Sequence, residues 1–560
     1  MGLLAFFLTF ATLAGPGLTI DEPLDVRPGR DYVVSLWRNG WGFFERTNVD
    51  RLFRDNAEHP PLGRWLLGLA SLGGQPFETL IRGADPTGLY VVSARLAPAV
   101  CFALLVGLVG AEAARRWGRA SGFAAAWSLL VMPRVFAHAH LGALDTFLSL
   151  FWTLALIAGA RAVDARRPTL AMVGAGALWS LALLTKIHAW LLAPLIVGWA
   201  FLRLPPLKAL RATAAWLATG VGLFVLGWPW LWYDTLDRWA AFWGTSVARA
   251  TIRVEYFGRI WNDRELPWHY PWLYFAVTVP VVLQGLGALG LWRGWRGRRN
   301  DRFPLLLAAS ILLFLTLFSA RVPVYDGERL FLLVFPAWAI MAGLGFGVLW
   351  ERWDGASPPP SDDRREGARP TRAATGGRPY ARWARAVGIH GGIWSARLAL
   401  GGILLGQAWG LVATHPFGLS YYNLLVGGLP GAERLGLELT YWGDAVDRVL
   451  LDELARRVET GNVAALAPTL YPGQGAYTTT GPLVRREVVL QDESEIPRAD
   501  WVVVSRREAY WSPELRRLLE AADPADRVMV RSRQGVWLSA LLRVPAHRKA
   551  PRNDPRKPQF

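Results

Sequence analysis

Residues 2–23 read GLLAFFLTFATLAGPGLTIDEP, an apolar segment that ends at two adjacent carboxylates, Asp21 and Glu22. Charge beside hydrocarbon is costly unless it faces water, a partner or a substrate, so this junction is the leading candidate for a functional site. The alternative interpretation is a solvated loop start that only marks the membrane interface. The apolar segment lacks a basic leader and a clear cleavage site, so we expect a retained anchor rather than a signal peptide.

The composition of the 560-residue chain indicates a polytopic membrane protein. Hydrophobic residues make up 52% of the chain, with 30 Trp and 25 Phe, and the mean hydropathy is +0.22. This is not the composition of a soluble globular protein. The net charge of +17 comes mostly from short basic clusters between apolar segments, a pattern typical of topology signals rather than of nucleic-acid binding. The single cysteine, Cys101, excludes an intramolecular disulfide framework.

About eleven apolar segments are long enough to cross roughly 30 Å of hydrocarbon. The turn near Lys186 predicts a break within the membrane. The expected spans are 2–20, 90–112, 120–137, 146–161, 168–185, 188–203, 212–230, 270–292, 303–320, 329–350 and 393–413.

Loops between these segments alternate in charge, which predicts their sidedness. Arginine clusters fall at 115–119, 161–167, 203–211, 293–302 and 351–396, and the positive-inside rule places them in the cytoplasm. The intervening loops, above all 21–89, then face outward and carry most of the carboxylates and histidines. Segment 351–392 has the composition of a disordered cytoplasmic linker.

Residues 414–560 predict a second domain, which follows the membrane domain of residues 1–413. Short β-branched segments at 463–467, 501–505, 528–531 and 536–544 alternate with an amphipathic helix at 444–458. This pattern indicates a small α/β domain large enough for its own core. The helix count places it on the extracytoplasmic side.

The first outer loop contains Glu58-His59-Pro60-Pro61-Leu62-Gly63. The two prolines favour the start of an amphipathic helix that lies in the membrane interface. An interfacial anchor is the simpler interpretation, and it is compatible with Glu58 or His59 lining a site.

Several of these motifs together resemble a known enzyme family. Asp21-Glu22 after the first helix, followed by His59-Pro60-Pro61, resembles the protein O-mannosyltransferase and lipid A aminoarabinose transferase group, glycosyltransferase family 39. The likeness continues at 132–146, at Glu328-Arg329-Leu330-Phe331 and at 415–423, and covers about residues 1–430. It implies a GT-C-like fold and favours the bacterial branch, in the cell inner membrane.

The resemblance also implies chemistry on the outer face of the membrane. The donor would be a sugar linked to polyprenyl phosphate, and the acceptor a hydroxyl group. Asp21 is carried over as the base that takes the acceptor proton in an inverting displacement. Glu22 is expected to orient the acceptor or tune Asp21, because neighbouring carboxylates perturb one another.

A departing phosphate requires cations near the membrane surface. Arg329, Lys186 and Arg134 lie near outer ends of apolar segments, where the alternative is a side chain that snorkels to the interface. Glu58, His59, His140 and Asp145 are candidates for acceptor contacts or supporting roles. His59, His138, His140 and Asp145 are also usual ligand types for a divalent metal, although no tight spacing indicates such a site.

Two other function classes compete with a transferase. A flippase or transporter of polyprenyl-linked glycan would also have many helices and a broken one, but should show repeated halves and charges at mid-membrane. A non-catalytic envelope assembly scaffold would use residues 415–560 for partners and leaves Asp21-Glu22 unexplained. The acceptor stays open between protein, lipid and glycan.

Overall fold

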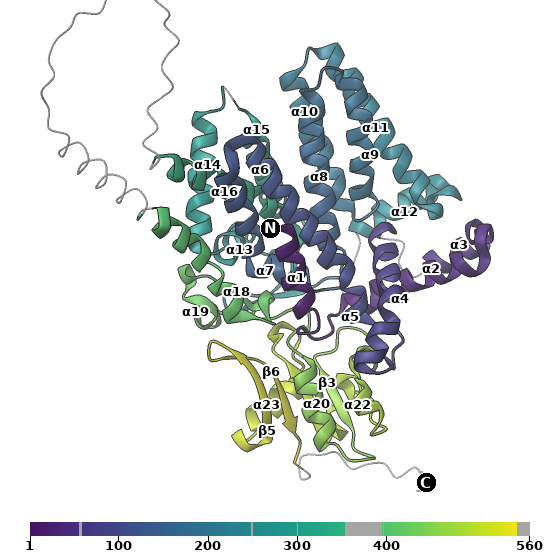
Figure 1. The fold of residues 1–560 in the computed structure, drawn as a ribbon. Helices are drawn as coiled ribbons and strands as arrows, with labels where there is room; N and C mark the ends of the chain where they lie inside the picture. Colours follow the sequence, from purple (N-terminus) through teal and green to yellow (C-terminus); the bar gives the residue numbers. More distant parts are fainter. Residues whose placement is uncertain (55–58, 248–249, 300, 353–394, 396, 546–560) are drawn as a thin grey trace, which may run out of the picture.

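A helical bundle stands on a smaller domain that contains a β-sheet (Figure 1). The computed structural model describes residues 1–54, 59–247, 250–299, 301–352, 395 and 397–545. The expected linker at 351–392 therefore lies almost wholly outside the described residues. The predicted fold class, an α-helical polytopic protein with a small C-terminal α/β domain, is confirmed.

The bundle is built from apolar helices of unequal length. Within the described residues, five are long and apolar enough to cross a membrane, or six if one bent pair forms a single span. They are accompanied by four shorter apolar helices. The number of eleven crossings stays a prediction. The helices are α1 (Gly2–Thr12), α6 (Leu96–Leu130), α8 (Asp145–Val163), α9 (Pro168–Leu183), α10 (Leu192–Arg203), α11 (Pro206–Gly227), α13 (Tyr270–Thr278), α14 (Val281–Arg296), α15 (Phe303–Ser319), α16 (Val334–Arg352) and α18 (Trp409–Thr414).

Helix boundaries differ from the sequence prediction where proline and glycine intervene. The expected span 120–137 ends at Leu130, and α7 (Pro133–His138) is a separate short helix that starts at a proline. Within α6 the chain turns at Trp117 and Gly118, whose φ of 85° suits glycine. The predicted break near Lys186 is present, because α9 ends at Leu183 and the next turn, η2 (Ile187–Leu191), begins after it.

Small residues let α14 and α16 approach closely. A Cβ on Gly290 would lie 1.9 Å from the backbone oxygen of Met341, and one on Gly345 would lie 2.0 Å from that of Leu286. Close backbone approach of this kind is a common way for membrane helices to associate, since lipid offers little hydrophobic driving force between them.

The first outer loop is mostly helical. The helix predicted after Pro61 is α4 (Leu62–Arg82). Helices α2 (Asp21–Asn39) and α5 (Val91–Ala94) pack against it, and α3 (Arg46–Phe53) packs against α2. Helix α2 was not predicted, because its buried stripe begins with Glu22 and Asp25 rather than with apolar residues. Glu22 and Asp25 instead form ion pairs with arginines outside α2, Arg95 and Arg64.

The segment between α11 and α13, which the charge pattern predicts to face outward, carries structure that the sequence did not indicate. Helix α12 (Thr235–Val247) is followed by a short antiparallel hairpin of β1 (Arg253–Tyr256) and β2 (Arg259–Asn262). The backbone N–H of Gly258, in the hairpin turn, donates to the oxygen of Gly436, which lies in the C-terminal domain ahead of its sheet.

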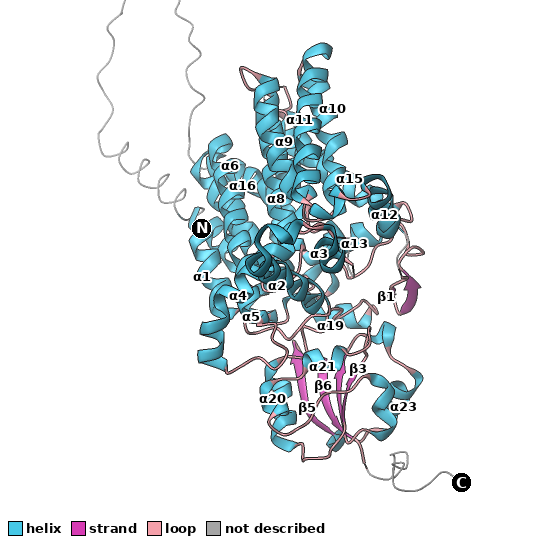
Figure 2. Ribbon diagram, turned by 90° about the vertical axis from the view of Figure 1, so that its right-hand side faces the viewer, coloured by secondary structure: helices cyan, strands magenta, loops and turns pink. Residues whose placement is uncertain are grey.

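The C-terminal domain has a four-stranded sheet with the order β3-β4-β6-β5. The strands β3 (Ala464–Ala467), β4 (Trp501–Ser505), β5 (Arg527–Arg533) and β6 (Val536–Arg543) agree closely with the predicted ones. Helices α20 (Arg448–Arg457) and α23 (Pro513–Ala521) cover opposite faces (Figure 2). Because both faces of β4 are covered, all five of its residues are buried, which explains its continuous apolar sequence.

Backbone hydrogen bonds fasten this domain to the start of α2. The N–H of Gly17 donates to Asp444 O at 2.7 Å, and the N–H of Ile20 donates to Trp442 O at 3.1 Å. A Cβ on Gly17 would lie 2.1 Å from Val446 O, so only glycine permits this approach. Since these segments touch, the first outer loop and the C-terminal domain lie on the same side of the bundle.

Candidate functional site

Asp21 is the first residue of α2, where a carboxylate is favoured by the positive end of the helix dipole. Its side chain is 24% exposed and forms an ion pair with Nη2 of Arg329. The chain therefore brings together two predicted site residues that are 308 positions apart.

Arg329 lies in a turn, η4 (Arg329–Phe331), just before α16. Besides Asp21, it contacts Asp145 (Nε to Oδ2, 3.3 Å) and Asp326 (Nη1 to Oδ2, 3.0 Å). Its guanidinium carbon lies 4.1 Å from the centre of the Trp442 ring. Planar guanidinium groups suit such shared ion pairing and stacking.

Lys186 adds a second cation. Its Nζ lies 2.5 Å from Oδ1 of Asp145, and both side chains are buried. Asp145 thus pairs with Lys186 through one carboxylate oxygen and with Arg329 through the other. We call Asp21, Asp145, Lys186, Asp326 and Arg329 the Asp21 cluster.

His59 belongs to the surroundings of this cluster. Burial, together with the charges of Arg64, Lys186 and Arg329, lowers the pKa of His59 well below its ordinary value. The imidazole is therefore neutral near pH 7. Its backbone oxygen accepts a hydrogen bond from Arg64, which also pairs with Asp25 of α2. Glu58 lies outside the described residues.

The C-terminal domain supplies a further cation. Arg507 donates from Nη2 to Oδ1 of Asp326 at 2.9 Å, so Asp326 bridges Arg507 and Arg329 with its two oxygens. Nε of Arg507 also lies 3.7 Å from the carboxylate of Glu438. Asp326, Trp442 and Arg507 were not identified from the sequence, since they stand among unremarkable loop residues.

Glu22 faces away from this cluster and holds Arg95. Its two oxygens accept from Nε and Nη2 of Arg95 at 2.6 and 2.7 Å, and from the backbone N–H groups of Thr19 and Gly142. Arg95 in turn donates to the backbone oxygens of Leu13, Pro16 and Gly17. All of these contacts except the one with Gly142 order the chain that leads into Asp21, so we expect Glu22 to position that chain.

Arg134 and His140 do not join the cluster. Arg134 is buried and pairs with Glu328 (2.6 Å), while its Nε donates to Tyr421 O. His140 contacts Thr12 Oγ1 and Phe136 O. Both side chains are therefore used in contacts within the protein.

The sequence offers four side chains of the types that bind a divalent metal, His59, His138, His140 and Asp145. Across the described ranges, no group of three or more His, Cys, Asp or Glu side chains is arranged to hold a metal ion.

The first prediction separates Glu22 from its neighbour. Glu22→Gln leaves Arg95 buried with no carboxylate, which should lower the free energy of unfolding by about 3–5 kcal/mol. Asp21→Asn is the matched control, because Asp21 is partly exposed and Arg329 keeps two other carboxylates. Thermal unfolding of both purified variants tests this. Equal stability of the two would contradict the positioning role of Glu22.

The second prediction concerns pH. Burial raises the pKa of Glu438 from 4.5 to about 8, although Arg507 opposes the shift. The folded protein therefore holds a proton that the unfolded chain loses above about pH 4.5, so this residue makes stability fall between pH 4.5 and 8. Glu438→Gln should remove that loss and raise Tm relative to wild type at pH 8 but not at pH 5. A Tm difference that is the same at both values would exclude this titration.

Comparison with known proteins supports the resemblance seen in the motifs. A family model described as dolichyl-phosphate-mannose-protein mannosyltransferase matches residues 58–233, which include His59, Asp145 and Lys186. The resemblance to this glycosyltransferase family is thus confirmed over that segment. No curated protein matches the chain in sequence.

Solved structures of low sequence identity also align with the chain. ArnT from Cupriavidus metallidurans in the apo state is 18% identical, with a TM-score of 0.49, over 98% of this chain and 97% of that one. The same protein bound to undecaprenyl phosphate gives a TM-score of 0.48 at 18% identity, over 98% of each chain. The archaeal oligosaccharyltransferase AglB from Archaeoglobus fulgidus, in complex with an inhibitory peptide and a dolichol-phosphate, is 12% identical with a TM-score of 0.38, over 80% of this chain and 61% of that one.

Proposed function

We propose that the protein is a membrane glycosyltransferase that moves a sugar from a polyprenyl-phosphate donor to a hydroxyl acceptor on the extracytoplasmic face, with inversion. The observation that carries the proposal is the Asp21 cluster, in which the partly exposed carboxylate of Asp21 pairs with Arg329, and Arg329 shares Asp145 with a second cation, Lys186. The family model that matches residues 58–233 is named for a dolichyl-phosphate-linked sugar donor. This agrees with a lipid phosphate as the leaving group.

In this mechanism Asp21 accepts the proton of the acceptor hydroxyl. The acceptor oxygen forms a bond to the anomeric carbon while the bond from that carbon to the phosphate oxygen breaks, and the electron pair leaves with the phosphate. Arg329 and Lys186 stabilise the charge that develops there. Arg329 pairs with Asp21 in the structure. A donor phosphate that binds the guanidinium would therefore release the Asp21 oxygen, which could then accept the proton of the acceptor hydroxyl.

The arrangement favours a transferase over transport. The proposed base lies at the start of α2, beside a turn that precedes α16, and both elements contact the C-terminal domain through Trp442 or Arg507. A polyprenyl-glycan flippase stays the second candidate because Lys186 stands in a break between helices, a feature that transporters share. A donor lipid that still carries its sugar after incubation with the protein would favour the flippase over the transferase.

The third prediction tests the base. Asp21→Asn keeps the volume of the side chain but cannot accept a proton, so transfer should fall by roughly 100-fold or more. Asp31→Asn, an exposed carboxylate on the same helix, is the matched control and should transfer at the wild-type rate. Activity is measured with purified, folded protein. Near wild-type transfer by Asp21→Asn would leave Asp145 as the next carboxylate to test.

The fourth prediction tests the donor phosphate. Arg329→Ala should raise the activation free energy of transfer by about 2–4 kcal/mol. Arg329→Lys should recover only part of the lost activity, because an ammonium group lacks the planar fork of donors that can contact three carboxylates and a phosphate. Arg134→Lys is the matched control, since Arg134 is buried with Glu328; it should alter Tm rather than kcat/KM. Wild-type kinetics of folded Arg329→Lys would remove Arg329 from the site.

A further inference from the structure

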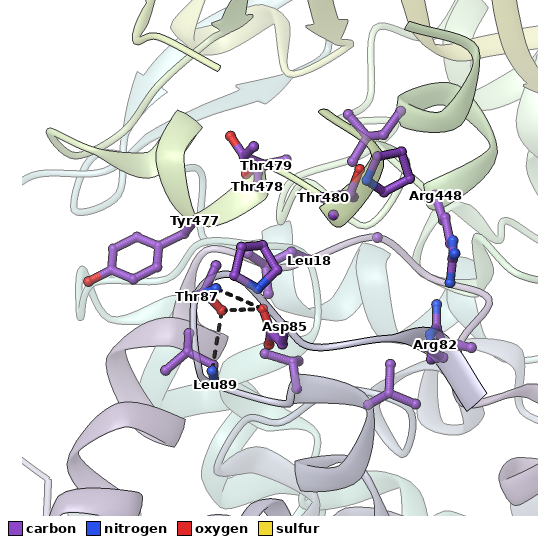
Figure 3. A pocket seen from close by; sticks show the side chains of 18 of the residues that line it. Leu18, Arg82, Asp85, Thr87, Leu89, Arg448, Tyr477, Thr478, Thr479 and Thr480 are labelled. Atoms are coloured by element: carbon purple, nitrogen blue, oxygen red, sulfur yellow. Dashed lines mark hydrogen bonds between the residues drawn. The ribbon is translucent and has the colours of Figure 1, made fainter. Parts of the chain in front are cut away.

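A separate cavity lies where the first outer loop meets the C-terminal domain. Its volume is about 220 Å³, and no residue of the Asp21 cluster lines it. The walls come from the chain after α1, the end of α4, the segment before α5, the start of α20 and residues 477–485. In Figure 3, Arg82 of α4 and Arg448 of α20 point toward one another across it. Two parts of the protein therefore present like charges to a shared space.

The carboxylates on the wall are already engaged. Glu78 accepts from the N–H and the hydroxyl of Ser93, at 2.8 and 2.7 Å. Asp85 accepts from Thr87 and from the N–H of Tyr90. Arg95 also reaches the wall, but its charge is balanced by Glu22.

Three further arginines line the cavity, Arg82, Arg448 and Arg485, and they outnumber its two carboxylates, Glu78 and Asp85. In the part of the chain that the structure describes, neither Arg82 nor Arg485 forms an ion pair, and Arg448 has only Asp452 at 3.4 Å. Although the carboxylates of Glu78 and Asp452 act in the opposite direction, burial and repulsion by the positive charge of Arg448 lower the pKa of Arg82. An anion between them would remove this repulsion.

The cavity lies at the level where apolar helices end. Pro16 follows α1, and Val91 begins the apolar stretch Val91–Leu130, which is long enough to span a membrane. Just before Arg82, α4 exposes Phe77 (69%), Leu80 (84%) and Ile81 (80%). Exposed apolar residues followed by arginine are suited to a helix at the boundary between acyl chains and headgroups. The anions found at this level are lipid phosphates.

We propose that this cavity binds the phosphate of an anionic lipid headgroup, which bridges Arg82 and Arg448 and fastens the C-terminal domain to the first outer loop. Guanidinium groups bind phosphate oxygens through paired charge-assisted hydrogen bonds. The bound lipid acts apart from donor and acceptor. Because the same domain supplies Arg507 to Asp326, occupancy of the cavity also secures the Asp21 cluster.

Thermal unfolding of the full chain in lipid nanodiscs tests the proposal. Discs of phosphatidylcholine alone are compared with discs that contain phosphatidylglycerol, and with neutral discs supplied with inorganic phosphate. Wild type should unfold at a higher temperature with phosphatidylglycerol. Arg82→Gln and Arg448→Gln should each lose most of that increase, while Arg517→Gln, which removes an exposed arginine of α23, should keep it.

A charge reversal provides a variant that should gain stability. Arg82→Glu places a carboxylate opposite Arg448, so it should raise Tm in neutral discs and abolish the response to phosphatidylglycerol. The proposal is overturned if wild type does not respond to phosphatidylglycerol, or if both Gln variants respond as wild type does. If inorganic phosphate alone reproduces the whole shift, the lipid source is excluded.

Discussion

One arginine shared by three carboxylates is the constraint on which the site depends. Arg329 contacts Asp21 at the start of α2, Asp145 at the start of α8 and Asp326 in the loop before α16. A buried charge is tolerated only when partners surround it, and removal of Arg329 would leave three carboxylates without the cation that they share. The positions of three chain segments far apart in sequence are therefore fixed together around a single guanidinium group, whose remaining face lies against Trp442.

The C-terminal domain takes part in this arrangement. Trp442 stacks on Arg329, and Arg507 occupies the second oxygen of Asp326. Backbone hydrogen bonds from Gly17 and Ile20 hold the segment that enters α2 against residues 442–444. The domain thus supports Asp21 from one side and Arg329 from the other, so its docking and the geometry of the cluster are physically linked. An anionic lipid between Arg82 and Arg448 would act on that same docking.

The sequence predicted much of the fold because apolar length, proline and β-branched segments report local structure. The four strands of the terminal sheet and the helix after Pro61 follow from such patterns. Asp21, Arg329 and Lys186 could be selected as a group only through the family resemblance, since nothing local indicates that they meet. Helix α2 was missed because its buried face carries Glu22 and Asp25, whose partners Arg95 and Arg64 lie far along the chain. Arg134 was predicted as a donor-phosphate ligand from its position near a helix end, and its buried ion pair with Glu328 could not be predicted because it depends on tertiary structure.

The central claim is that sugar leaves a lipid phosphate at the Asp21 cluster. Its most direct test is to incubate the purified full chain with polyprenyl phosphate sugars and candidate acceptors and to follow the lipid by mass spectrometry, with the anomeric configuration of the product determined by NMR. The account predicts that free polyprenyl phosphate and a glycosylated hydroxyl appear together, with inverted configuration at the anomeric carbon. Recovery of the donor lipid with its sugar still attached, under conditions in which the protein binds it, would contradict the account and favour transport.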